Sequence, residues 1–176
     1  MPGITVKVRL QDIKKLETDA LIVGFYEDSR PLKNLAGELD WLLCGSLSEL
    51  IIKRKISGAL GDVALFASRG KVPAGKIFMV GLGPLAAVSA VSLREAAKEA
   101  IAGSLKAGVK QVAIECFSAP AVPYETIIPA LLQGANEGSK GGTISMTILA
   151  GDAGSYERIS KVAGIDRDSR STVVET

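Results

Sequence analysis

The stretch Lys76-Ile77-Phe78-Met79-Val80-Gly81-Leu82-Gly83-Pro84 decides how the rest of this chain is arranged. Ile77 to Val80 is apolar at every position, which is typical of a strand covered on both faces of a sheet. Gly81 and Gly83 predict a sharp turn, because glycine accepts backbone angles and close approaches that other residues do not. A helix follows after a short loop. The stretch therefore predicts a strand and crossover helix of an α/β sheet, in which ligands bind at the carboxyl ends of the strands.

Further strands and helices alternate on both sides of this unit. Strands are predicted over residues 4–10, 19–25, 62–67, 110–117 and 143–149, the first half-exposed at a sheet edge and the second central. Helices are predicted over 35–51, 92–108, 126–138 and 155–163. The pattern indicates an α/β fold around a mixed, mostly parallel sheet of about six strands. We expect one domain, residues 1–164, followed by a mobile tail, residues 165–176.

Local signals predict how some of these helices begin and bend. Ser92 and Glu95 form a capping-box pattern at the start of one helix. Another helix is expected to start near Thr126, because the proline that follows is then tolerated in the first turn. Gly45 predicts close packing or a kink inside the 35–51 helix. Trp41 lies off the leucine stripe of that helix, and it is interpreted as a rim residue packing over a loop, with a partner or ligand contact as the alternative.

Composition excludes several classes of function. The 176 residues contain no histidine, which removes Ser-His-Asp and Cys-His catalysis and the commonest zinc sites. The net charge of +2 is too close to balance for a dedicated nucleic-acid binder. Cys44 and Cys116 are expected to be small buried side chains in a reducing compartment. Because no membrane-length apolar run and no signal-peptide pattern is seen, we expect a cytoplasmic protein with no membrane partner.

Four carboxylates are candidates for acid–base or metal chemistry: Glu27, Asp28, Asp40 and Glu49. Such chemistry needs paired and positioned groups, whereas these four are spread over a loop and a helix surface. We therefore predict solvated charges, no catalytic residue and no metal site.

The order of four segments resembles the N-terminal domain of leucyl aminopeptidases. These segments are Asp19–Phe25, the helix with Leu39-Asp40 and Leu47–Leu50, Lys76–Gly83, and Ser92–Ala97. Leu132–Ala135 also resembles a later helix of that domain, so the resemblance covers about residues 4–163. The family's dimetal site lies in a C-terminal domain, whose signatures Asp-Ser-Gly-Gly and Asn-Thr-Asp-Ala-Glu-Gly-Arg do not occur in this sequence. The resemblance implies a free-standing, non-catalytic interaction module without a cofactor, whose partner is a separate catalytic aminopeptidase subunit or a second copy of itself.

That N-terminal domain is similar in fold to macro domains, many of which bind ADP-ribose. The resemblance implies a three-layer α/β/α fold with a ligand cleft at the carboxyl ends of two strands. An alternative function is therefore binding, or weak hydrolysis, of ADP-ribose or another phosphorylated metabolite. The chain has Gly24–Asp28 where macro domains carry an Asn-rich segment and a glycine run. The residues expected to bind a ligand are Gly24, Phe25, Tyr26, Gly81, Leu82, Gly83 and Pro84.

The glycine turn also fits the pattern Gly-x-Gly-x-x-Ala. A dinucleotide fingerprint opens a helix directly, whereas Pro84 and several further residues precede Ser92 here. Nicotinamide and flavin cofactors are therefore not expected. Phosphate binding by the loop amides and a turn without a ligand both stay open.

A third function, nucleic-acid binding, would need five basic residues to form one patch. Cations near a helix C-terminus also stabilise the helix through its macrodipole. A solvated helix end is therefore the preferred interpretation of the basic triplet, and nucleic acid is not the expected partner. The five residues are Lys53, Arg54, Lys55, Arg69 and Lys71.

Overall fold

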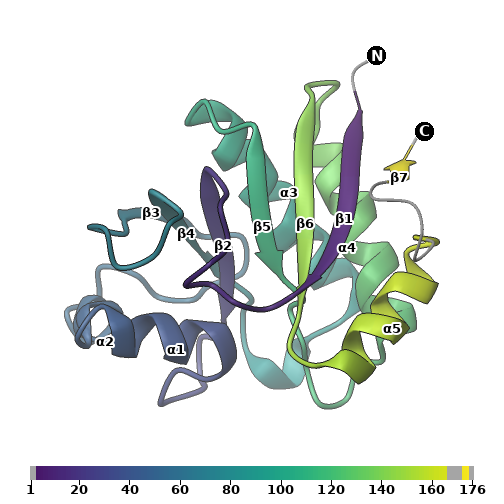
Figure 1. The fold of residues 1–176 in the computed structure, drawn as a ribbon. Coiled ribbons are helices and arrows are strands. Elements are labelled where there is room, and N and C mark those ends of the chain that lie inside the picture. Colours follow the sequence, from purple (N-terminus) through teal and green to yellow (C-terminus); the bar gives the residue numbers. More distant parts are fainter. Residues whose placement is uncertain (1–2, 166–171, 175–176) are drawn as a thin grey trace.

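A seven-stranded mixed sheet forms the centre of the computed structural model, which describes residues 3–165 and 172–174 (Figure 1). Five strands run parallel: β1 (Ile4–Leu10), β2 (Ala20–Phe25), β4 (Lys76–Gly81), β5 (Gln111–Glu115) and β6 (Ile144–Ala150). The two edge strands are antiparallel: β3 (Val63–Ala67) and β7 (Thr172–Val174). The order across the sheet is β3-β4-β2-β5-β6-β1-β7. The predicted α/β class and the mostly parallel sheet are confirmed, with β7 added to the six predicted strands.

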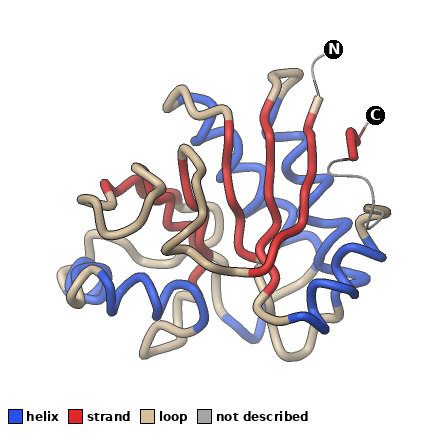
Figure 2. The backbone as a smooth tube through the Cα atoms, in the orientation of Figure 1, coloured by secondary structure: helices blue, strands red, loops and turns tan. Residues whose placement is uncertain are grey.

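Helices cover both faces of the sheet and complete three layers (Figure 2). One face carries α1 (Asn34–Leu42) and α2 (Ser46–Ile52), and the other carries α3 (Ala90–Lys106) and α4 (Tyr124–Ser139). The last helix, α5 (Ala153–Val162), packs beside α4 and contacts β1 and β6. A short 3₁₀ turn, Leu85–Ala87, precedes α3.

Within the described part of the chain, no helix has the length and apolarity that crossing a membrane requires.

The central strands are buried on both sides because their side chains alternate between two apolar cores. On β2, Ile22 packs with the α3–α4 core, whereas Leu21 and Val23 pack with the α1–α2 core. Helices α3 and α4 lie unusually close, since a Cβ on Gly134 would come within 2.1 Å of the Arg94 carbonyl oxygen. The prediction that the continuous apolar runs are strands covered on both faces is therefore confirmed.

The prediction of one helix over residues 35–51 is wrong. The chain breaks into α1 and α2 at a turn in which Cys44 and Gly45 both have positive φ, 55° and 79°. The Asp40 carboxylate accepts hydrogen bonds from the Leu47 and Ser48 amides at 2.9 and 3.0 Å and so caps the new helix. The turn also exposes Cys44, which we expected to be buried, whereas Cys116 is buried as expected; both thiols are free.

Two predicted helix starts are also displaced. Helix α3 begins at Ala90 behind a capping box formed by Ser89 and Ser92, two serines that bond to each other's backbone amides. Glu95 instead pairs with Lys98 at 3.0 Å. Helix α4 begins two residues before Thr126, so its proline lies in the second turn.

The amino-terminal strand β1 is not a sheet edge, because β7 pairs with its first three residues. Thr172–Val174 lie in the segment expected to be a mobile tail. The rest of that expectation falls largely on residues 166–171 and 175–176, which lie outside the described residues. The domain boundary at residue 164 stays a prediction.

Candidate functional site

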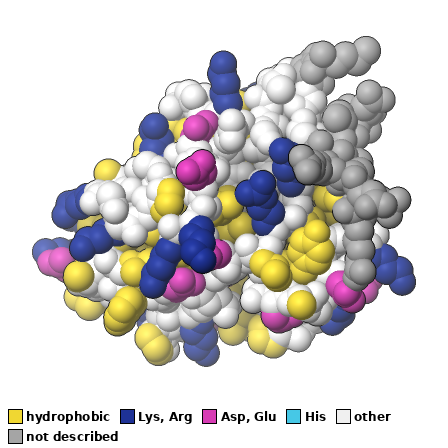
Figure 3. Space-filling view, in the orientation of Figure 1, with side chains coloured by type: hydrophobic (Ala, Val, Ile, Leu, Met, Phe, Trp, Pro, Cys, Tyr) yellow, Lys and Arg dark blue, Asp and Glu magenta, His cyan; other side chains and the backbone are white. Residues whose placement is uncertain are grey.

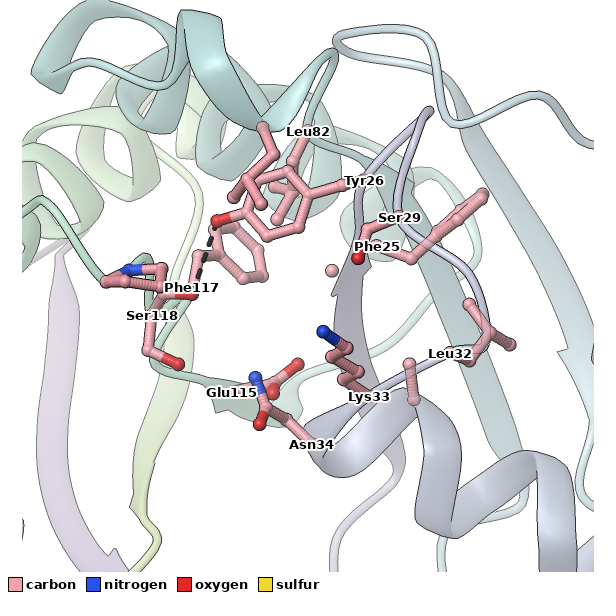
Figure 4. A pocket seen from close by; sticks show the side chains of 14 residues that line it. Phe25, Tyr26, Ser29, Leu32, Lys33, Asn34, Leu82, Glu115, Phe117 and Ser118 are labelled. Atoms are coloured by element: carbon pink, nitrogen blue, oxygen red, sulfur yellow. Dashed lines mark hydrogen bonds between the residues drawn. The ribbon is translucent and has the colours of Figure 1, made fainter.

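A cleft with a cavity volume of about 180 Å³ opens at the carboxyl ends of β2 and β5 and beside the loop after β4 (Figure 4). Four of the seven residues expected to bind a ligand line it: Gly24, Phe25, Tyr26 and Leu82. The start of α1 and the loop after β5 form the remaining walls. The cavity is smaller than the roughly 300–1,000 Å³ of pockets that hold drug-sized ligands.

The other three expected residues, Gly81, Gly83 and Pro84, do not line this cavity. The glycine turn packs against the loop before β3, since a Cβ on Gly81 would lie 1.9 Å from the Ala59 carbonyl oxygen. Its amides are already engaged: those of Gly81, Leu82 and Gly83 donate at 2.8–3.0 Å to the carbonyl oxygens of Asp62, Phe25 and Gly58, respectively. A phosphate held by this turn would have to displace hydrogen bonds that join it to its neighbours.

The floor of the cleft is filled by apolar side chains. Because Gly24 has no side chain, Leu82 and Phe117 close over it, and a Cβ there would lie 2.8 Å from both. Tyr26 spans the cleft and donates its hydroxyl to the Ser118 carbonyl oxygen at 3.2 Å (Figure 4). Burial, followed by the nearby Glu115 carboxyl, raises the pKa of Tyr26 to about 12. Tyr26 is therefore a neutral hydrogen-bond donor that links the ends of β2 and β5.

Glu115 is a polar residue of the cleft that sequence reasoning missed. It ends β5 with only 7% of its surface exposed. Its Oε1 accepts a hydrogen bond from the Leu35 amide at 3.3 Å in the first turn of α1, and the Gly24 amide also donates to the carboxyl. Burial raises the pKa of Glu115 to about 8, although these two bonds partly oppose the shift. The carboxyl therefore links β5 to α1 and β2 by accepting hydrogen bonds from their backbone amides. The sequence signal that could have identified it is a glutamate at the end of an apolar strand.

Polar side chains from α1 share this side of the cleft. Lys33 and Asn34 lie beside Glu115, with the Lys33 amino group directed into the opening (Figure 4). A second cavity of about 210 Å³ adjoins the first through Asn34, Glu115 and Ser118 and continues toward Asp152 at the start of α5. The arrangement can hold a small polar molecule; it places one carboxyl next to one amine, without a positioned nucleophile.

Three of the four candidate carboxylates have separate structural roles. Asp40 is the cap of α2, so its interpretation as a solvated charge is wrong. Asp28 accepts from the Leu85 amide at 2.9 Å, and Glu49 pairs with Lys53 on the surface. Among residues 3–165, no cluster of three or more Asp, Glu or Cys side chains is placed to hold a metal ion.

The five basic residues fall into two groups. Lys53–Lys55 follow α2, near the amino end of β3, whereas Arg69 and Lys71 lie in the turn at its carboxyl end. A five-residue strand spans about 17 Å. In the view of Figure 3, dark-blue basic side chains are scattered among acidic and apolar ones rather than gathered in one continuous area. That nucleic acid is not the partner of these residues stays a prediction.

Trp41 is 76% exposed, so the interpretation that it packs over a loop is wrong. Ile52 on α2 is 80% exposed. The layer formed by α1 and α2 therefore presents two large apolar side chains to its surroundings.

Comparison with known proteins gives a family match over most of this architecture. The chain matches the model of the cytosol aminopeptidase family, N-terminal domain, over residues 22–139. It is 31% identical over 135 residues to a probable cytosol aminopeptidase of Geobacter sulfurreducens, which covers 77% of this chain and 27% of the relative. A relative from Alkaliphilus metalliredigens is 31% identical over 111 residues, 63% of this chain and 22% of its own length. The chain spans about a quarter of the length of these relatives.

Solved structures of two kinds share the fold. A mutant of tomato leucine aminopeptidase superposes with a TM-score of 0.66 at 22% identity, over 92% of this chain and 36% of that one. A Trypanosoma brucei macrodomain in complex with ADP-ribose gives 0.70 at 14% identity, over 90% and 69% of the two chains. An Oceanobacillus iheyensis macrodomain with bound MES gives 0.73 at 11% identity, over 89% of each chain. At such identities the likeness shows the macrodomain-like fold alone.

The family model covers more than half of the chain, and the structural likeness extends over nearly all of it. The protein therefore belongs to the cytosol aminopeptidase family, of which it carries the N-terminal domain.

Proposed function

We propose that this chain is a non-catalytic interaction module that binds the catalytic domain of a cytosol aminopeptidase. The observation that carries the proposal is the match over residues 22–139 to the N-terminal domain of that family. The dimetal signatures expected of the catalytic domain are absent from this sequence. The catalytic domain is either carried by a separate subunit or joined to this one.

The exposed Trp41 on α1 supports a protein partner. Tryptophan is enriched at the energetic centres of interfaces because it buries a large area with few rotatable bonds. An isolated exposed apolar side chain needs no explanation, but Trp41 is accompanied by Ile52 in the same helical layer. We place the contact with the catalytic domain on this layer.

Fluorescence tests the contact directly, since Trp41 is the single tryptophan of the sequence. Mixing the chain with the catalytic part of the Geobacter sulfurreducens relative should shift Trp41 emission to shorter wavelength as the indole leaves water. Trp41→Lys should abolish binding in calorimetry, whereas Val91→Lys, at a residue 67% exposed on α3, should not. Binding that Trp41→Lys leaves unchanged would refute this placement of the contact.

Catalysis is tested separately. The purified chain with Zn²⁺ or Mn²⁺ should not hydrolyse leucine amide above the rate of metal alone. Hydrolysis that survives repurification would overturn the assignment as a non-catalytic module.

A second candidate function is binding of ADP-ribose or another phosphorylated metabolite in the cleft. The position of the cleft at the strand carboxyl ends favours it, as does the fold shared with a macrodomain solved with ADP-ribose. It ranks second because the cavity is about 180 Å³ and the turn amides are already bonded. An amide NMR titration with ADP-ribose, ADP and phosphate should shift Gly24, Tyr26 and Leu82 if it is correct. Unchanged spectra at millimolar ligand would remove this candidate.

A further inference from the structure

The outer edge of β3 carries a row of backbone groups with no neighbouring strand. β3 is an edge strand of the sheet and pairs with β4 on its inner side (Figure 1). None of the hydrogen bonds found outside the sheet, within the described ranges, involves a backbone group of Val63–Ala67. Leu65, at the centre of β3, is 49% exposed, and Leu60 just before the strand is 45% exposed. Such an edge is a template for pairing with another strand.

The direction of each backbone group in β3 follows from the ladder. In an antiparallel pair, alternate residues point both their N–H and C=O groups toward the partner strand. Asp62 accepts from the Gly81 amide at 2.8 Å and Ser68 donates to the Gly75 carbonyl oxygen at 3.1 Å, so the even-numbered residues face β4. Val63, Leu65 and Ala67 therefore point their N–H and C=O groups outward.

These three residues are spaced symmetrically about Leu65. If a second β3 lies antiparallel against the first, with Leu65 opposite Leu65, then Val63 lies opposite Ala67 at both ends. All six outward N–H and C=O groups of each strand then meet partners in the other. Residues directly opposite each other in a ladder have their side chains on the same face, so the two half-exposed Leu65 side chains also come into contact.

The charges at the ends of β3 fit the same arrangement. Asp62 is exposed at the amino end, and Arg69 and Lys71 are exposed just after the carboxyl end. Antiparallel pairing brings Asp62 of one strand toward Arg69 and Lys71 of the other, twice by symmetry, with Arg54 and Lys55 also lying near Asp62. An unrelated strand would have to supply both this charge order and a matching register.

We propose that two copies of this chain associate through β3, antiparallel about a two-fold axis at Leu65, so that their sheets join into one. The contact belongs to the isologous class, in which one surface patch serves both subunits. It is confined to one short strand and its flanks, which places it among the small, transient interfaces. This inference does not rest on the contact proposed for Trp41.

The test is the oligomeric state of the full chain by sedimentation velocity from about 1 µM to about 1 mM, the range in which small interfaces associate. The wild type should pass from monomer to dimer within it. Leu65→Lys should raise the dimer Kd about tenfold or more, because like charges then face each other across the axis. Leu10→Lys is the matched control, since Leu10 is 54% exposed on β1 and should leave the dimer unchanged.

A mixture of charge variants tests the register itself. Leu65→Lys and Leu65→Glu should each dimerise at least about tenfold more weakly than the wild type, and an equal mixture should restore a heterodimer because opposite charges then meet at the axis. Circular dichroism and thermal unfolding of each variant establish that it is folded. A wild type that stays monomeric up to 1 mM would overturn the proposal and leave the edge to a strand of another protein. A dimer Kd that is unchanged in both single variants would overturn it as well.

Discussion

Replacing Glu115 by glutamine should remove a pH dependence that this carboxyl imposes on the whole fold. Burial raises the pKa of Glu115 from 4.5 to about 8. The folded chain therefore keeps a proton that the unfolded chain has already released, and the free energy of unfolding falls as pH rises between these values. One pKa unit corresponds to about 1.4 kcal/mol, so the wild type should lose up to about 5 kcal/mol across this window. That is a large share of the roughly 5–15 kcal/mol typical of a domain.

The fall in the free energy of unfolding between about pH 5 and about pH 9 can be assigned to Glu115, because few other groups change their protonation in that range. The chain has no histidine, and burial raises the pKa of Cys116 from 9.0 to about 12, so this thiol lowers the free energy of unfolding only as pH approaches 9, where it ionises in the unfolded chain. Urea unfolding from about pH 5 to about pH 9 should show wild-type stability falling up to about pH 8 and more slowly beyond it, as Glu115 ionises in the folded chain as well. Glu115→Gln keeps an oxygen acceptor for the Leu35 amide and cannot ionise, so its stability should stay nearly level over the same range.

The two proteins should therefore be similar in stability near pH 5 and differ most near pH 9, with the glutamine variant more stable there. Glu17→Gln is the control, because Glu17 is an exposed loop residue and its replacement should leave the wild-type slope unchanged. A wild-type free energy of unfolding that stays constant from pH 5 to pH 9 would refute the buried-carboxyl argument. So would a Glu115→Gln protein with the same slope as the wild type.

Two further substitutions test the turns that position the cleft. Gly81→Ala places a Cβ 1.9 Å from the backbone oxygen of Ala59, so we expect a loss of about 3 kcal/mol or more in urea unfolding; Gly75→Ala, where a Cβ meets nothing within 4 Å, should be close to neutral. Equal stability of the two variants would contradict the close approach. Asp40→Ala should cost about 1–2 kcal/mol through the lost cap of α2, whereas Asp40→Asn should cost little, since Asn caps as well as Asp; equal losses would instead assign the effect to charge.

The strands could be predicted because the apolar pattern that identifies each one lies within its own residues. Residues 77–80 and 20–25 are apolar without interruption, and burial on both faces explains that composition in the structure. The break between α1 and α2 could not be predicted in the same way. It depends on a positive φ at Cys44, a residue with no preference for it, and on an Asp40 carboxylate that caps the next helix rather than facing water.

The candidate site was predicted only where strand ends define it. Gly24, Phe25 and Tyr26 follow directly from the end of β2, and the structure places all three in the cleft wall. Glu115 was missed because its partner, the Leu35 amide, lies 80 residues earlier in the chain. No local pattern predicts that a carboxyl at the end of one strand will cap a helix that comes beside it only in the folded chain.

A cleft at strand ends binds phosphate through free backbone amides and an open floor. In this chain the amides are hydrogen-bonded to neighbouring segments, and apolar side chains fill the floor. The amides of the turn after β4 are bonded to the loop before β3 and to β2. Leu82 and Phe117 occupy the floor above Gly24, and Tyr26 ties the two rims together. Each of these contacts stabilises the end of the sheet and reduces the room left for a ligand in the cleft. In the described part of the chain, Trp41 in the α1–α2 layer is exposed, and the outer edge of β3 has no neighbouring strand. These two surfaces are the observations for which we propose an interaction module ahead of a nucleotide binder.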